Sequence, residues 1–194
     1  MKDEVFEHES EAKPKSQGPR VLLEIALVVC FLAWAGYAYL QYGYTDRDRG
    51  YGRVKCANNL RQIGLAITLY AGDFHGEYPD SLGTLLLTED ITAAVFDCPQ
   101  TADDPPDEPT TKSIVDHLMD GGHMSYVYLG SGLKNGSVPA DAVIAYEPLS
   151  NHDGAGMNVL FGDDHVEFLD ANVGAKIITA AAATTRPVIV PGLP

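Results

Sequence analysis

The chain has 194 residues and a formal net charge of -14. This length allows one ordinary domain plus a membrane anchor, but not two full domains. The acidic balance argues against a nucleic-acid partner, because phosphate binding needs clustered Lys and Arg, and it favours a solvated surface, cation binding or a basic partner instead.

An apolar run at residues 21–42 has the length and composition of a membrane-spanning helix. A helix of about 20 apolar residues crosses the bilayer core, and this run carries one charged residue, Glu24. Its aromatic residues gather toward the C-terminal end, as interfacial aromatics do. A cleaved signal peptide fits less well, because its apolar core would be shorter and a small-residue cleavage site would close it. The remaining alternative is a buried helix of a soluble protein.

The next segment, residues 43–52, is rich in glycine and is expected to interrupt the helix and act as a linker. A second, amphipathic helix is predicted to begin near Arg53 and to end near Gly72. Its apolar residues recur every three or four positions, which places them on one face: Cys56, Leu60, Ile63, Ile67 and Tyr70. A turn at 76–83 and a short helix near 82–87 follow.

The second half of the chain has the pattern of antiparallel strands. Residues 99–113 are rich in Pro and acidic residues and are predicted to be a surface loop. The strand candidates are residues 126–129, 142–146, 157–161 and 165–169, the last two forming a hairpin. A final helix is expected at 171–183. A helix followed by a run of antiparallel strands is typical of the α+β class.

These elements divide the chain into an anchor and one domain. The predicted segments are a disordered cytoplasmic N-terminus (1–20), a transmembrane helix (21–42), the glycine-rich linker (43–52), the α+β domain (53–183) and a loosely held C-terminal tail (184–194).

Two of the three cysteines lie in polar sequence outside the apolar run. Cys56 and Cys98 are an even pair, as a single disulfide in an oxidising compartment requires. The alternative is that they are two unrelated small core residues. Their spacing does not match a zinc site, which usually needs three or four ligands.

Three stretches of the sequence resemble one bacterial family. Residues 55–86 read KCANNLRQIGLAITLYAGDFHGEYPDSLGTLL, and the block 56–64 is the most diagnostic part. Residues 96–99 read FDCP, and residues 151–170 read NHDGAGMNVLFGDDHVEFLD. Together they resemble the pseudopilin-like proteins with a prepilin-type cleavage and methylation segment, which include the major, G-type pseudopilins of type II secretion. The resemblance covers most of residues 53–170.

The resemblance implies a pilin-like fold, in which an amphipathic helix packs on a small antiparallel sheet behind a transmembrane helix. It implies a non-enzymatic structural or interaction protein of a type II secretion or type IV pilus-like envelope system. Its partners would be the inner membrane, other pseudopilin or secretion-system subunits and further copies of the chain. Because Lys and Arg flank both ends of the apolar run, the positive-inside rule does not decide the orientation. The disulfide and the resemblance both favour a single-pass protein of the bacterial inner membrane with a periplasmic domain.

The N-terminal processing motif of the family is altered in this chain. Prepilins are cut after a Gly that precedes Phe-Thr-Leu-Ile-Glu, whereas here Pro19 follows Gly18 and Glu24 falls one place later than in the motif. These departures weaken the expectation of cleavage and methylation at Gly18. In pilins the matching Glu neutralises the N-terminal amine of a neighbouring subunit, so Glu24 is a candidate assembly residue. Its alternative is simple placement near the membrane edge.

The hairpin end of the domain is the candidate ligand site. Asp153, Asp163 and Asp164 supply carboxylates of the kind that bind calcium, and the G-type pseudopilins bind calcium in a C-terminal loop. The competing interpretation is turn chemistry, because Asp tolerates the left-handed conformations of tight turns. A second function hypothesis places a metal-dependent enzyme or ligand-binding domain at the end of the hairpin bounded by His152 and His165.

Overall fold

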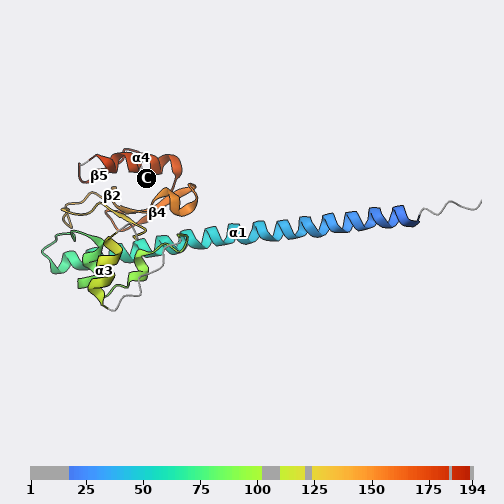
Figure 1. Cartoon of the computed structure of the whole chain (residues 1–194). Coiled ribbons are helices and arrows are strands. Elements are labelled where there is room, and N and C mark those ends of the chain that lie inside the picture. The colour runs from blue at the N-terminus through green and yellow to red at the C-terminus, as the bar shows by residue number, and fades with distance from the viewer. Residues whose placement is uncertain (1–17, 102–109, 121–123, 184, 193–194) are drawn as a thin grey trace, which may run out of the picture. The chain divides into compact units, whose positions relative to one another are not determined.

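The computed structural model describes residues 18–101, 110–120, 124–183 and 185–192 (Figure 1). The N-terminus was expected to be disordered over residues 1–20. Residues 1–17 lie outside the described ranges, and the expectation is wrong for residues 18–20, which form the start of the first helix. The chain divides into two compact units, Met1–Thr45 and Asp46–Pro194, which are described separately. The helices are α1 (Gly18–Asp73), α2 (Leu82–Thr88), α3 (Thr111–Met119) and α4 (Ala171–Ala182), with 3-10 turns η1 (Ala93–Phe96) and η2 (Leu149–His152). The strands are β1 (Val127–Tyr128), β2 (Ala142–Tyr146), β3 (Gly156–Phe161), β4 (Val166–Asp170) and β5 (Val188–Ile189).

The first unit contains the apolar part of α1. The segment Arg20–Tyr42 is 23 residues long and apolar enough to cross a membrane. No other helix among the described residues has the length and apolar composition of a membrane span. Its large apolar side chains, such as Leu22, Phe31 and Trp34, are exposed along the helix. Since exposed apolar surface of this extent is unfavourable in water, a lipid or protein environment must cover it.

The prediction that the glycine-rich residues 43–52 interrupt the helix and form a linker is wrong. α1 runs without interruption from Gly18 to Asp73, over 56 residues. Glycine lowers helix stability by only about 1 kcal/mol relative to alanine, which long flanking helices tolerate. At Gly52 the absence of a side chain also has a packing use: a Cβ there would lie 2.3 Å from the side chain of Gln100.

The second unit is built around an antiparallel five-stranded sheet. Four strands follow the order β1-β2-β3-β4, and the fifth, β5, pairs with β2. β3 and β4 form the predicted hairpin, in register from Gly156 opposite Asp170 to Leu160 opposite Val166. β2 occupies residues 142–146, as the sequence predicted. Together with the helices, this sheet confirms the α+β class in its coarse form.

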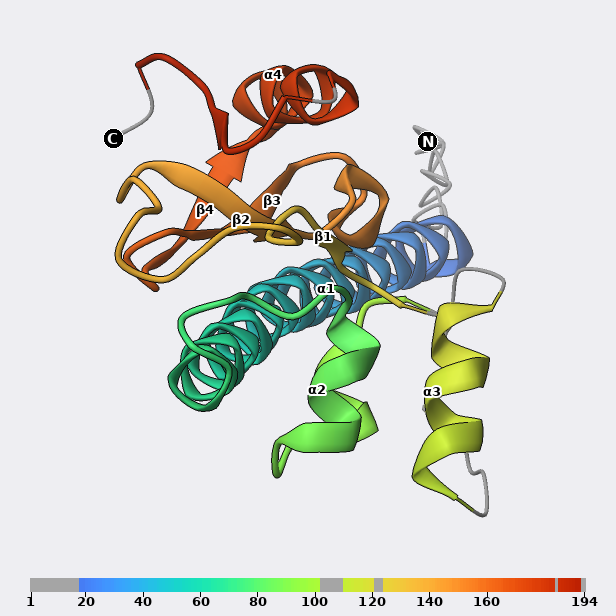
Figure 2. The same ribbon diagram turned by 90° about the vertical axis from the view of Figure 1, so that its left-hand side faces the viewer.

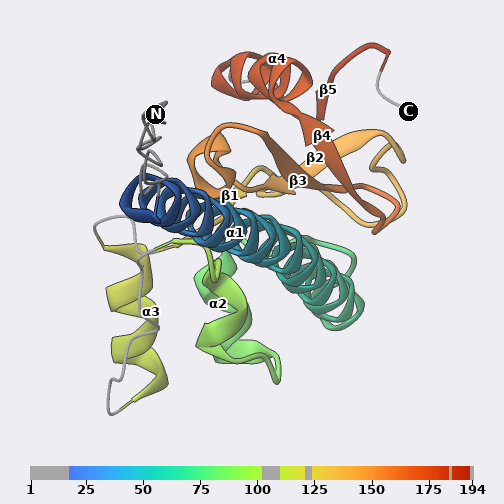
Figure 3. The ribbon, with the colours of Figure 1, turned by 90° about the vertical axis from the view of Figure 1, so that its right-hand side faces the viewer.

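Helices cover both faces of the sheet. The part of α1 from residue 46 onward lies against one face, with α2 and α3 on the far side of α1, whereas α4 covers the opposite face (Figures 2 and 3). Leu60, Ile63 and Ile67 of α1 share a core with Ile144 and Leu160 of the sheet, as the helical periodicity predicted. A second core lies beneath α4 and includes Ile177, Val143, Met157, Val159 and Phe161.

Two further parts of the chain differ from the sequence-based expectation. α3, with a capping box at Thr110, begins inside the segment 99–113 that was predicted to be a loop. Within its described residues, 185–192, the tail is not loosely held: β5 pairs with β2, and Val188 and Val190 are buried. β5 lies along the edge of β2 that is left open beyond β1, so a tertiary contact orders this short apolar stretch.

Candidate functional site

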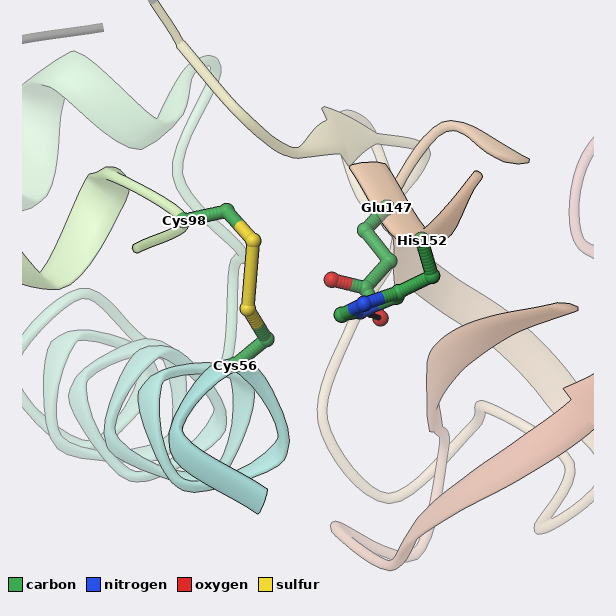
Figure 4. A group of neighbouring side chains, drawn as sticks. All are labelled: Cys56, Cys98, Glu147 and His152. Atoms are coloured by element: carbon green, nitrogen blue, oxygen red, sulfur yellow. Dashed lines mark hydrogen bonds and ion pairs between the residues drawn. A yellow bond between two sulfur atoms is a disulfide. The ribbon is translucent and has the colours of Figure 1, made fainter. Parts of the chain in front are cut away.

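A buried polar cluster lies between α1 and the sheet, and it is the most unusual chemical feature of the described residues. It consists of Cys56 of α1, Cys98 after η1, Glu147 after β2 and His152 at the end of η2 (Figure 4). All four residues are buried, and one ligand atom from each lies within 4.8 Å of the others. Among the described residues, no other group of three or more His, Cys, Asp or Glu side chains is this close.

The disulfide forms one side of the cluster. Cys56 and Cys98 are bonded, with their Cα atoms 5.6 Å apart, as predicted from the sequence. The backbone N–H of Cys98 donates to Ser125 Oγ at 2.9 Å. Asn59 of α1 donates to the backbone oxygen of Asp97 at 2.8 Å. Independently of the sulfur–sulfur bond, the Asn59 hydrogen bond holds the segment that carries Cys98 against α1. The Ser125 hydrogen bond holds the same segment against the residues before β1.

Glu147 is the central acceptor on the other side. Its Oε1 accepts from the backbone N–H of Asn158 at 2.7 Å and from Asn158 Nδ2 at 2.5 Å. The same oxygen lies 2.8 Å from His152 Nε2. Its other oxygen, Oε2, is buried without a hydrogen-bond partner among the described residues. In Figure 4 one carboxylate oxygen lies against the imidazole and the other points toward the sulfurs.

The imidazole of His152 is fixed on three sides. Nε2 faces Glu147, and Nδ1 lies 3.1 Å from Oε1 of Gln100. The ring meets Phe168 edge-on, with the centroids 5.9 Å apart. Both ring nitrogens face oxygen atoms, so each nitrogen donates a hydrogen bond to its oxygen whenever it carries a proton.

Strand alternation explains why this polar group sits beneath the sheet. Along β3, Met157 and Val159 point into the core under α4, so Asn158 points toward α1. There Asn158 Nδ2 also donates to the backbone oxygen of Arg53 at 3.1 Å. Asn158 therefore connects the strand, the helix and Glu147.

The three acidic residues expected to hold calcium are not brought together as one group. Asp163 is exposed and pairs with His165, and Asp164 Oδ2 accepts from Thr68 Oγ1 of α1 at 3.1 Å. Asp153 and Asp164 have positive φ angles of 54° and 67°. This geometry favours the turn interpretation, since Asp tolerates the left-handed region. Calcium binding at this end stays a prediction.

The pKa values at this turn shift in opposite directions. Burial raises the pKa of Asp164, with the neighbouring Asp163 adding to the effect and the Thr68 hydrogen bond opposing it. The hydrogen bond from His165 is the main cause that lowers the pKa of Asp163. A raised folded-state pKa means that ionised Asp164 destabilises the fold at neutral pH, whereas ionised Asp163 stabilises it.

We expect Asp164→Asn to stabilise the protein at pH 7 by roughly a few tenths of a kcal/mol, because solvent screens this partly exposed site. Asparagine keeps the acceptor for Thr68 and tolerates the positive φ. The gain should fade as the pH falls to about 3, below the ordinary aspartate pKa of about 3.9, where the group is protonated in the unfolded chain as well. Chemical denaturation at both pH values measures it. Asp163→Asn is the control with the opposite sign, and a matching gain there would refute the assignment.

The N-terminal candidates lie on α1. Gly18 is its first residue, and Glu24 is exposed within the apolar segment. No contact described in the structure assigns either of them a role, so processing at Gly18 and assembly through Glu24 stay predictions.

One residue of the buried cluster was missed by sequence reasoning. Glu147 directly follows the apolar strand 142–146, and an acidic residue in that position usually marks a strand end in solvent. Its spacing of five residues before His152 was the available signal. The hypothesis of a catalytic or ligand site that combines His152 and His165 is not favoured, because His152 is buried against Glu147 and His165 is exposed and pairs with Asp163.

Comparison with known proteins gives no match: no family model matches the chain, and no curated protein or solved structure resembles it significantly. The resemblance of residues 53–170 to pseudopilin-like proteins therefore stays a prediction from sequence motifs. The structure independently establishes a mixed helical and antiparallel fold with one apolar helix long enough to span a membrane.

Proposed function

We propose that this protein is a membrane-anchored, pseudopilin-like structural or interaction protein of a bacterial type II secretion or type IV pilus-like envelope system. Its single span would lie in the inner membrane and its domain in the periplasm. The observation that carries the proposal is the continuity of α1. One helix contains the apolar segment Arg20–Tyr42 and also the residues that form the core beneath the sheet.

The continuous helix suits a packing module. A subunit of this kind associates through the apolar surface of its span, and here that surface is exposed on every side of the helix. A single carboxylate within such a surface, Glu24, needs a partner or the interface, since a charge is costly among lipid chains. These features support lateral association between copies or with related subunits.

The buried disulfide also supports a role outside the cytoplasm. Disulfides persist in oxidising compartments, and Cys56–Cys98 ties the helix to the segment before α3. The domain therefore has a covalent link between its central helix and the segment before α3, which suits a subunit held among neighbouring subunits.

Lateral association can be tested with a cysteine that the chain already has. Cys30 is exposed in the apolar segment, while the other two cysteines form the disulfide. Mild oxidation of bacterial membranes that contain the protein should produce a dimer linked through Cys30. Cys30→Ser should abolish this product, and Glu24→Ala should reduce it several-fold if the carboxylate guides association. A monomer under all conditions, with no partner linked to Cys30, would contradict the proposed function.

The mass of the intact protein from the same membranes decides the form of assembly. A chain that begins at Pro19 would show that prepilin peptidase accepts the altered site, and filament assembly with Glu24 facing a neighbouring amine would follow. A full-length chain that still cross-links would indicate a permanently anchored relative. In that case Glu24 would act without a processed N-terminus.

A further inference from the structure

We propose that Cys56, Cys98, Glu147 and His152 form a binding site for a zinc-class transition-metal ion when the two cysteines are reduced. The disulfide and the bound metal would then be alternative states of one buried cluster. The cluster lies entirely within the unit formed by residues 46–194. The proposal does not depend on the function of the membrane-anchored chain.

The arrangement of the four side chains is close to that of a tetrahedral site. Zinc binds thiolate sulfur at about 2.3 Å and imidazole nitrogen at about 2.0 Å, so its ligand atoms lie about 3 to 4 Å from one another. The four ligand atoms here lie within 4.8 Å of one another. In Figure 4 the two sulfurs face the carboxylate and the imidazole across a common space. Small side-chain movements are therefore sufficient to surround one ion.

The orphaned oxygen of Glu147 is a second, independent indication. Glu147 is fully buried, yet its Oε2 has no hydrogen-bond partner among the described residues. Leaving a buried carboxylate oxygen unsatisfied costs about 1 to 3 kcal/mol or more, so such an atom needs an explanation. A cation between Oε2 and the sulfurs would supply the missing partner.

The surrounding contacts suit a metal site. Asn158 would continue to hold Glu147 Oε1 through its backbone and side-chain N–H groups. His152 Nε2 would release Glu147 and bind the ion, while Nδ1–H donated to Gln100 Oε1. Metal-binding histidines usually donate their second N–H to an oxygen in this way, which fixes the tautomer and the ring orientation. Gln100 is thus a positioning residue.

The donor set indicates the class of ion. Two thiolates and an imidazole prefer zinc and similar first-row metals, whereas calcium and magnesium prefer sites made only of oxygen atoms. Binding needs two free thiols, so the disulfide must first accept two electrons and two protons. With a water-soluble phosphine as reductant, the phosphine becomes its oxide, taking oxygen from water, and water also supplies both protons. Coordination of the divalent ion then releases the two thiol protons.

The test uses the full chain in detergent micelles, in a Cys30→Ser background that removes the third thiol. After reduction with phosphine, cobalt(II) serves as the probe. We expect one cobalt per chain, with thiolate-to-cobalt charge-transfer absorption and the intense visible bands of a tetrahedral site, and displacement by zinc. The oxidised chain should show neither signal. An equal cobalt signal from the oxidised chain, or none from a reduced chain that stays folded by circular dichroism, would overturn the proposal.

The cobalt affinities of single-residue variants identify which side chains bind the ion. Glu147→Gln keeps the side-chain shape and an acceptor for Asn158 but removes the charged ligand, and we expect the reduced chain to lose about 100-fold in cobalt affinity. Gln100→Leu should cost about 10-fold while keeping the tetrahedral spectrum, because it removes the oxygen that orients His152 and leaves all four ligands in place. Asp163→Asn, at the exposed carboxylate, should change nothing. If Glu147→Gln fails to fold, Gln100→Leu carries the test, and unchanged affinity in that variant would reject the positioning of His152 by Gln100.

Discussion

Replacing Glu147 with alanine in the oxidised protein is expected to lower the free energy of unfolding by about 3 to 5 kcal/mol. The loss follows from burial, because Oε1 accepts both N–H groups of Asn158 and faces His152. Removing the carboxylate leaves these buried groups without their hydrogen-bond acceptor. Chemical denaturation of the full chain in micelles, followed by far-ultraviolet circular dichroism, measures the change.

The chain offers a matched control for this prediction. Asp163 and His165 form a second carboxylate–imidazole pair, but their side chains are 49% and 41% exposed, compared with 0% for Glu147 and 2% for His152. Exposed ion pairs contribute less than about 1 kcal/mol. Asp163→Ala should therefore have a small effect. Similar losses for the two variants would mean that the stabilisation does not come from burial.

Removing the disulfide through the double change Cys56→Ala and Cys98→Ala should destabilise the metal-free protein by about 4 kcal/mol. The bond closes a loop between residues 42 positions apart, so its loss restores considerable freedom to the unfolded chain. Thermal unfolding of the variant and of the oxidised parent, both with a metal chelator present, measures the difference. Folding itself should survive, since Asn59 and Ser125 still hold the segment around Cys98.

The control for the disulfide is the third cysteine. Cys30→Ser removes an exposed thiol that belongs to no bond, so the stability of the domain should not change. If the double variant were as stable as Cys30→Ser, the Cys56–Cys98 bond would not be formed in the purified protein. In that case the reduced pair would be the resting state, and the metal site would become the main role of these cysteines.

The sequence by itself determined the elements that depend on local patterns. The apolar span at 21–42, the helical face of Leu60 and Ile63, and the β3–β4 hairpin were all predicted, because periodicity and turn residues act over short distances. The pairing of Cys56 and Cys98 was also predicted, since the third cysteine lies in the apolar run. The pseudopilin-like function remains the interpretation of those motifs.

The tertiary structure alone decided the features that depend on distant neighbours. α1 continues through the glycine-rich stretch, and Gly52 makes room for Gln100, which is far away in the sequence. In the sequence, Glu147 is an acidic residue at the end of a strand, which suggests exposure to solvent. In the structure it is buried with His152 and the two cysteines. Burial changes what a carboxylate does, because the cost of an unsatisfied polar atom depends on whether water reaches it. That depends on how separate segments pack, which local sequence patterns do not specify.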